Sequence, residues 1–378
     1  MAISGLQRIA KGIPYFVCAW LDGPNRSLAY SDRRLDRMMM RLGSAGVDYI
    51  RLMPWPQGLQ PYRRDPSGRF DLNLWNKDYF TELSRIAKTA ARWRIATYYD
   101  LYDHCGLRDK YRELNPWTWN TQNIDGIYDV SVEAMCHYFR WTRKIVETVG
   151  LRGYFENKSG RKIRIKPNLF GLGNELTFRG DRKHLHEWAN TWGYGHAKHL
   201  RSLGYKKEIL WSAEHETGQA LRAYISPEGN PQGLFRYSGT VEQFHGWVRQ
   251  ADCADTIRNT TRGRKLAYSD DGVHCTSDLH GDGICIKKGN REAFCSASTH
   301  SVIRLCRYIK GAVQNKHQFH HIEQLPRSIS ETYSTPDDLD QHRDVNIYWR
   351  IAKSVWNVNA KRTYPQWMYE KYLPGVSL

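Results

Sequence analysis

The sequence predicts an α/β protein, a (β/α)₈ barrel with long loops on the C-terminal face of its strands. Eight short, largely apolar runs alternate with segments whose apolar residues recur at helical spacing, which is typical of a parallel sheet. The three longest connections all follow expected strands, and active sites of such barrels are built from those loops. No interdomain linker, fixed-period repeat or low-complexity segment is evident, so we expect one domain over residues 1–378.

The eight expected strands share their short length and apolar character. They span 13–20, 47–53, 95–101, 168–175, 208–214, 241–245, 264–270 and 318–323. The fourth run ends abruptly on Asn174-Glu175. The sixth run, 241–245, has the weakest pattern. If it were a loop, Glu323 would move from the end of the eighth strand to the end of the seventh.

Capping residues and apolar stripes define the helices. The first begins at Ser31-Asp32 and ends at Gly43 and Gly46, with the stripe Leu35, Met38, Met39 and Leu42. The second begins at Asn76, with the stripe Phe80, Leu83, Ile86, Ala87 and Ala90. The third begins at Ser131, with the stripe Val132, Met135, Cys136, Phe139, Ile145 and Val149. The remaining expected helices span 184–203, 219–225, 248–259, 298–313 and 345–358.

Three long loops and one basic connection complete the chain. The loops span 54–75, 103–130 and 271–296, and a hairpin-like connection covers Arg152 to Lys166. Because parallel strands of a barrel end at one mouth, all three loops are expected on the same face as Glu175.

The chain is strongly basic, with 56 Lys and Arg against 39 Asp and Glu, a net charge of +17 and a pI near 9.5. Such a balance fits nucleic acid, an acidic polysaccharide, a negatively charged envelope or an ordinary solvated surface. The charges are spread along the chain without a basic tail, and no nucleic-acid motif accompanies them. We expect no nucleic-acid partner. The N-terminus lacks a signal-peptide pattern and no run is long enough to span a membrane, so a soluble monomer is expected.

The eight cysteines fall into different settings. Cys18, Cys136 and Cys306 lie within apolar patterns and are expected in the core. Cys275, Cys285 and Cys295 share the loop 271–296 with two histidines. A zinc site, a disulfide and three free thiols are all open there, but the spacing lacks CxxC pairs, so no metal is predicted. Nucleotide-binding glycine motifs are absent, so no cofactor is expected.

Ionisable residues gather at the expected strand ends. They are Arg51, Asp100, Asp103, His104, Asn174-Glu175, Glu214, His215, Glu216, His245, Asp270, Asp271 and Glu323. Glycoside hydrolysis needs two carboxyl groups flanking the scissile bond, one protonated and one ionised. A ring of strand-end carboxylates therefore predicts a carbohydrate-cleaving site.

Several of these motifs resemble clan A glycoside hydrolases, the cellulase and mannanase type of barrel. Gly171-Leu-Gly-Asn174-Glu175 is similar to the clan's Asn-Glu signature, and Tyr49-Ile-Arg51-Leu52 to its strand 2 arginine. Asp103-His104, Phe244-His245-Gly-Trp247 and the lead into the second helix, 70–80, are also similar. The resemblance implies that Glu175 is the acid/base and that Asn174 hydrogen-bonds the sugar 2-OH.

The chain departs from the clan at the seventh strand, where the clan's nucleophilic Glu is replaced by Ser269-Asp270-Asp271-Gly272. The second carboxylate is either Asp270 or Asp271 from that strand, or Glu323 from the following one, with Glu323 slightly favoured by side-chain type. We expect a retaining mechanism, which requires the two carboxyls about 5–5.5 Å apart.

The surrounding residues are expected to bind sugar or support the carboxylates. Trp20, Trp55, Trp117, Trp119 and Trp247 are candidate stacking platforms, and about half of them are expected to pack in the core or the loops instead. His104, His245, Asp271 and Glu214 are candidate substrate ligands or wall residues. Arg51 is expected to hold a catalytic carboxylate ionised, and Asp100 to be buried and paired.

The sequence thus predicts hydrolysis of a β-linked mannan or glucan, endo-acting. A non-catalytic carbohydrate-binding barrel and a polyanion binder are the alternatives.

Overall fold

A computed structural model describes residues 17–20, 31–44, 47–52, 54, 59–102, 115–117, 127, 129–173, 189–207, 209–212, 240–245, 266–269, 320–322 and 362–375. For β1, β10–β12 and residues 41, 189–190 and 210–212 it gives the backbone path, and for the other described residues also the side chains.

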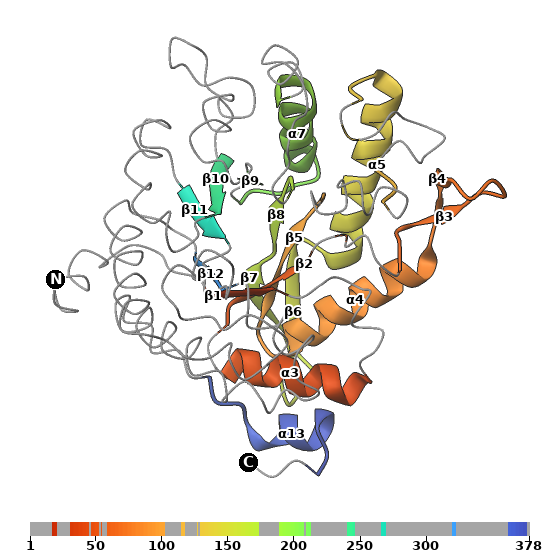
Figure 1. Ribbon diagram of the computed structural model, residues 1–378. Helices are drawn as coiled ribbons and strands as arrows, with labels where there is room; N and C mark the ends of the chain where they lie inside the picture. The colour runs from red at the N-terminus through yellow and green to blue at the C-terminus, as the bar shows by residue number, and fades with distance from the viewer. Residues whose placement is uncertain are drawn as a thin grey trace, which may run out of the picture.

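Eight parallel strands form one sheet at the centre of the molecule (Figure 1). They are β1 Val17–Trp20, β2 Tyr49–Leu52, β5 Ala96–Asp100, β8 Leu169–Gly171, β9 Ile209–Ser212, β10 Thr240–His245, β11 Leu266–Ser269 and β12 His320–Ile322. Their order is β11-β10-β9-β8-β5-β2-β1-β12, so each strand pairs with its neighbour in sequence and β12 returns to β1. The two edge strands, β11 and β12, also lie against each other. This is the strand arrangement of an α/β barrel.

The weakest of the predicted strands is present. β10 pairs in parallel with β9 through Val241↔Leu210 and with β11 through Phe244↔Tyr268. β11 is therefore the seventh strand and β12 the eighth. Glu323 follows the eighth strand, and the alternative in which it would follow the seventh is wrong.

Helices α3 (Asp32–Ser44) and α4 (Lys77–Arg92) match their predictions. Every residue of both predicted stripes is buried, because those residues face the sheet and the neighbouring helix. The side chain of Asn76 accepts a hydrogen bond from the amide of Asp78, which caps the first turn of α4. In Figure 1, α3, α4 and α5 (Val132–Val149) lie on one side of the sheet.

Helix α5 begins at the predicted cap, Ser131, and buries Ile145 and Val149 of the predicted stripe, but the rest of its buried face differs from that stripe. Cys136 is exposed and Val132 is 83% exposed, so the prediction of a core position for Cys136 was wrong. The helix instead buries Ala134, His137, Tyr138, Trp141, Thr142, Ile145, Val146 and Val149. Two large aromatic side chains, Tyr138 and Trp141, lie on that face, and Val132 and Cys136 lie on the outside.

Two antiparallel hairpins interrupt the strand–helix alternation, and both turns have the same chemistry. The expected loop 54–75 contains one, β3 Tyr62–Arg64 with β4 Phe70–Trp75, so the loop prediction was incomplete. The basic connection forms the other, β6 Arg152–Glu156 with β7 Lys162–Pro167, as predicted.

Each hairpin turn has the sequence Asp/Asn-x-Ser-Gly-Arg. The side-chain oxygen of Asp65 accepts from the amides of Ser67 and Arg69, both at 2.9 Å. Asn157 does the same for Ser159 and Arg161. The glycine of each turn, Gly68 or Gly160, has a positive φ, 82° or 77°, which favours Gly there.

A π-helical segment, Ala189–Gly193, leads into α7 (Tyr194–Ser202) within the expected helix 184–203. His196 of α7 is fully buried. Its Nδ1 lies 2.7 Å from the Trp192 carbonyl oxygen, and its Nε2 lies 3.0 Å from the Tyr102 hydroxyl. Burial lowers the pKa of His196 from 6.5 to about 3.

This histidine predicts a loss of stability in acid. Because its folded pKa lies below its unfolded pKa, the unfolded chain binds the proton first as pH falls below about 6.5. Stability should then fall by up to about 1.4 kcal/mol per pH unit until the pH approaches the folded pKa. His196→Gln should make this fall shallower in urea unfolding measured between pH 7 and 4. An equally steep fall in the variant would contradict this role.

A short C-terminal helix, α13 Gln366–Tyr372, was not predicted and packs beneath α3 (Figure 1). The Tyr364 hydroxyl donates to the Trp93 carbonyl oxygen at 2.5 Å, and Arg362 pairs with Asp48 at 2.7 Å. These contacts tie the end of the chain to the start of β2 and the end of α4.

The remaining predicted helices, 219–225, 248–259, 298–313 and 345–358, lie outside the described residues, as does the cysteine loop 271–296. Among the helices that the structure does describe, none is long and apolar enough to cross a membrane.

Candidate active site

The described part of the site is the end of three neighbouring strands, β2, β5 and β8. Arg51 pairs across the sheet with Tyr98, and Asp100 with Gly171. Arg51 is 1% exposed and Asp100 is fully buried. The Arg51 Nε donates to Asp100 Oδ2 at 2.6 Å, so a buried ion pair connects β2 to β5.

Tyr98 completes this arrangement from the same strand as Asp100. Its hydroxyl donates to Asp100 Oδ1 at 2.7 Å, and its ring centroid lies 5.3 Å from the guanidinium carbon of Arg51. Both carboxylate oxygens of Asp100 therefore accept a hydrogen bond, as a buried charge requires. The expectation of a buried, paired Asp100 is confirmed. Sequence reasoning missed Tyr98, whose only signal was its place two residues before Asp100.

Gly171 makes room for this carboxylate. A Cβ at position 171 would overlap Asp100 Oδ1 and would lie 2.9 Å from the Tyr98 hydroxyl. The backbone also holds the two strands together, since the Leu101 amide donates to the Gly171 carbonyl oxygen at 2.9 Å. The glycine at the end of β8 is thus required by the close approach of Asp100.

Gly171→Ala should therefore destabilise the fold by about 1–3 kcal/mol, the usual range for overpacking a buried site. Gly195→Ala is the matched control. Its added methyl would meet the flexible end of Met135, and Ala is the better helix former. Urea unfolding of both variants tests this, and equal midpoints would contradict the close-packing account.

The remaining predicted site residues are placed only in part. Trp20 and His245 are the last residues of β1 and β10. The others lie outside the described residues, namely Trp55, His104, Trp119, Asn174, Glu175, Glu214, Trp247, Asp270, Asp271 and Glu323.

Their positions in sequence relative to the strands are nevertheless defined. β8 ends at Gly171, three residues before Asn174 and four before Glu175. Asp270 directly follows the last residue of β11, and Glu323 that of β12. All eight strands are parallel, so their C-terminal ends lie at the same end of the sheet.

Trp117 is not a sugar platform, which corrects the prediction made for it. It is 2% exposed, and its ring packs edge-on against Tyr62 at 5.5 Å and Tyr102 at 5.2 Å. Trp117 also contacts Tyr138 and Trp141 of α5, and Trp141 contacts Tyr62 of the hairpin β3–β4, so these rings form one aromatic cluster. Within the described residues, no partner accepts from Trp117 Nε1.

Metal ligands do not gather in the described part of the chain. No three His, Cys, Asp or Glu side chains there lie close enough together to hold a metal ion.

Comparison with known proteins identifies the fold. A scan against family models finds no match, and neither does a search of curated protein sequences. A broad-specificity endoglucanase of glycoside hydrolase family 5 from an uncultured bacterium matches in structure with a TM-score of 0.53 at 10% identity. The match covers 93% of this chain and 96% of that one.

Two mannanases are similar to the same extent. The endo-1,4-β-mannanase from Rhizomucor miehei has a TM-score of 0.53 at 13% identity, covering 90% of this chain and 95% of its own. The endo-β-1,4-mannanase from Thermotoga petrophila has a TM-score of 0.51 at 11% identity, covering 94% and 80%. The resemblance to clan A barrels is therefore confirmed at the level of the fold.

Proposed function

We propose that this chain is a single-domain glycoside hydrolase that cleaves a β-linked polysaccharide of the mannan or glucan type. One observation carries the proposal: in sequence, Asn174-Glu175 follows β8, the fourth of eight parallel strands, and β8 pairs with β5, which carries Asp100 of the buried Arg51–Asp100 pair. The resemblance to clan A assigns the acid/base to that strand. The structural neighbours whose names describe endoglucanases and mannanases support the same substrate class.

The proposed chemistry divides two roles between two carboxyls. Glu175 protonates the departing sugar oxygen, and then, as a base, activates the water that releases the product. The second carboxylate attacks the anomeric carbon, which makes the mechanism retaining. Asn174 hydrogen-bonds the sugar 2-OH. Long loops on the C-terminal face would supply the endo-acting cleft and its aromatic platforms.

The second carboxylate is Asp270 or Glu323. The strand count supports Asp270, because it follows the seventh strand, where the clan carries its nucleophile. Side-chain type supports Glu323, which follows the eighth strand and is a glutamate as in the clan.

Arg51 is proposed to keep the second carboxylate ionised, since a nearby cation lowers a carboxylate pKa. Asp100 is a positioning residue in this scheme. Its ion pair and the Tyr98 hydroxyl fix the guanidinium of Arg51 at the end of β2. This support is rigid because it lies on adjacent strands rather than on loops.

A polysaccharide panel with product analysis tests the proposal. Incubation with mannan, cellulosic glucan and xylan should release oligosaccharides of mixed length from mannan or glucan, with retained anomeric configuration by NMR. Binding to a polysaccharide without any product would instead favour the non-catalytic carbohydrate-binding barrel.

A further inference from the structure

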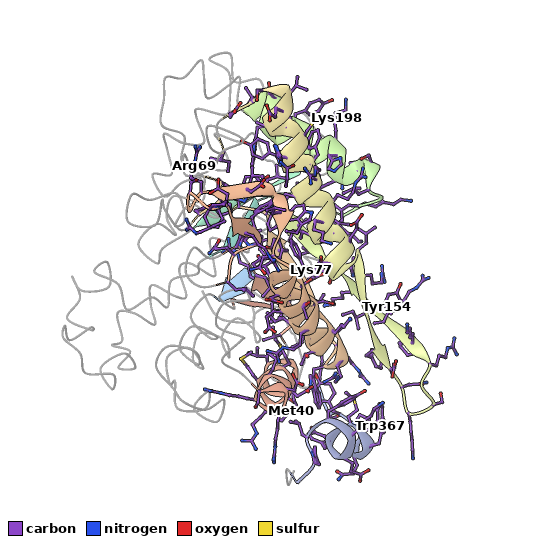
Figure 2. All side chains as sticks on the ribbon, turned by 90° about the vertical axis from the view of Figure 1, so that its right-hand side faces the viewer. Met40, Arg69, Lys77, Tyr154, Lys198 and Trp367 are labelled. Atoms are coloured by element: carbon purple, nitrogen blue, oxygen red, sulfur yellow. The ribbon has the colours of Figure 1, made fainter. Side chains whose placement is uncertain are left out.

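A basic groove runs along the outer wall of the barrel between α4 and α5. It consists of two hollows, one of about 850 Å³ near Trp75 and one of about 580 Å³ near the hairpin β6–β7. Ser84, Lys88, Glu147 and Thr148 line both hollows, so the two form one continuous groove. Figure 2 shows Lys77 on α4 and Tyr154 on the hairpin along this side of the molecule.

The groove is rich in positive charge. Its acidic residues are Glu147 and Glu156, and its basic residues are Lys77, Arg85, Lys88, Arg92, Lys144, Arg152, Lys162 and Lys371. Three of these basic residues pair with carboxylates: Arg85 with Glu82 and Asp32, Arg92 with Asp36, and Lys371 with Glu156.

The other five basic residues have no carboxylate partner in the described part of the chain, namely Lys77, Lys88, Lys144, Lys162 and Arg152, whose guanidinium donates to the Ile165 carbonyl oxygen. Lys77 and Lys88 are eleven residues apart on the same face of α4, which places them about 16 Å apart along the helix axis. Separated ammonium groups along one groove suit an extended polyanion better than a single small anion.

The described groove rings do not form a run of stacking platforms for nucleic-acid bases: Tyr154 is 48% exposed, but Trp75 and Tyr372 are covered by neighbouring side chains. Single-stranded nucleic acids are bound by stacking on open aromatic faces, but Trp75 stacks on the Tyr62 ring at 4.6 Å, and the guanidinium of Arg140 lies 5.9 Å from the Trp75 ring centroid. Tyr372 has the guanidinium of Arg92 over its ring at 4.2 Å. Four of the five groove cations without a carboxylate partner are lysines, and the fifth, Arg152, already donates to the Ile165 carbonyl oxygen at 3.0 Å. Bidentate phosphate recognition favours arginine.

We propose that this groove binds an acidic polysaccharide, one that carries carboxylate or sulfate groups along its length, outside the barrel mouth. The lysines supply the charge, and the hydroxyls of Thr81, Ser84 and Thr148 line the same groove to meet sugar hydroxyls. In sequence, the hairpin end of the groove precedes β8, whereas Glu175 follows β8. The choice of a polysaccharide as the ligand rests on the proposed function. The inference that the groove binds an extended polyanion rests on its lysines alone.

Binding by the full chain can be measured calorimetrically with polygalacturonate, dextran sulfate, a neutral glucan and poly(U) RNA as probes. Lys88→Glu/Lys144→Glu reverses two groove charges. Lys198→Glu/Lys206→Glu makes the same charge change at exposed lysines of α7 and the turn after it (Figure 2). Circular dichroism checks that both variants fold.

We expect the acidic polysaccharides to bind with an affinity that falls with salt, and the groove variant to weaken binding about tenfold or more while the control changes it little. If both variants lose affinity alike, or if neither does, the acidic polysaccharide does not bind in this groove. If poly(U) binds more tightly than the acidic polysaccharides and the groove variant weakens that binding, the ligand is a nucleic acid and the choice of a polysaccharide is wrong. Because binding is measured without turnover, a chain that hydrolyses nothing yet binds polygalacturonate through Lys88 and Lys144 would end the proposed function and leave this site standing.

Discussion

Replacing Glu175 by Gln is expected to abolish polysaccharide hydrolysis while leaving the fold intact. Gln keeps the size and the hydrogen-bonding capacity of the side chain but cannot donate a proton to the leaving oxygen. General acid catalysis contributes up to about 10⁴-fold, so the rate should fall by about a thousandfold or more. Release of reducing sugar from mannan or glucan measures this, with circular dichroism as the folding check.

Glu370→Gln is the matched control, because it makes the same chemical change at an exposed residue of α13 that is not at a strand end. It should retain most of the activity. Asp270→Asn and Glu323→Gln then identify the second carboxylate, since only one of them should match the loss in Glu175→Gln. If Glu175→Gln keeps its activity, Glu175 is not the acid/base.

Removing Asp100 is expected to have the largest effect on stability. Asp100→Ala leaves the buried guanidinium of Arg51 without its carboxylate, and an uncompensated buried charge costs about 3–5 kcal/mol. It also opens a cavity beside Gly171 and removes the acceptor of the Tyr98 hydroxyl. Urea unfolding at neutral pH should show a midpoint shifted down by that amount.

The double variant Arg51→Met/Asp100→Leu separates the charge from the packing. Replacing both members of a buried ion pair by apolar residues is often nearly neutral, so the double variant should be more stable than Asp100→Ala. Under the proposed function it should still lose activity, because Arg51 is absent. If the double variant is as unstable as Asp100→Ala, the unpaired charge of Arg51 is not the main cause of the lost stability.

The sequence predicted most of the fold because the strand–helix alternation and the helix caps are local signals. The apolar stripes of α3 and α4 identify their buried faces correctly because those faces are aliphatic. The stripe of α5 was right at Ile145 and Val149 but wrong at Val132 and Cys136, because aromatic and polar residues form much of the buried face. Tyr138, Trp141 and His137 pack there, while Val132 points to solvent.

The hairpin β3–β4 could have been predicted by comparing its turn with that of the hairpin β6–β7. Asp65-Pro-Ser-Gly-Arg69 has the same turn chemistry as Asn157-Lys-Ser-Gly-Arg161, which was recognised as a hairpin. Helix α13 carried no comparable signal. Its seven residues are held by tertiary contacts such as that of Tyr364 with Trp93, which no local pattern specifies.

The candidate site was predictable only where chemistry follows from strand position. Arg51 and Asp100 were identified as strand-end residues, and their pairing follows from the adjacency of β2 and β5. The role of Tyr98 and the packing requirement at Gly171 depend on cross-strand register, which a single sequence does not specify.

One measurement tests the central claim most directly, namely the separation of the Glu175 carboxyl from those of Asp270 and Glu323 in a crystal structure of the chain. The account predicts that one of these carboxyls lies about 5–5.5 Å from Glu175 across an open cleft. A separation of about 6.5–9.5 Å would change the expected outcome to inversion. A Glu175 turned away from the cleft, or with no carboxyl across it, would contradict the hydrolase assignment.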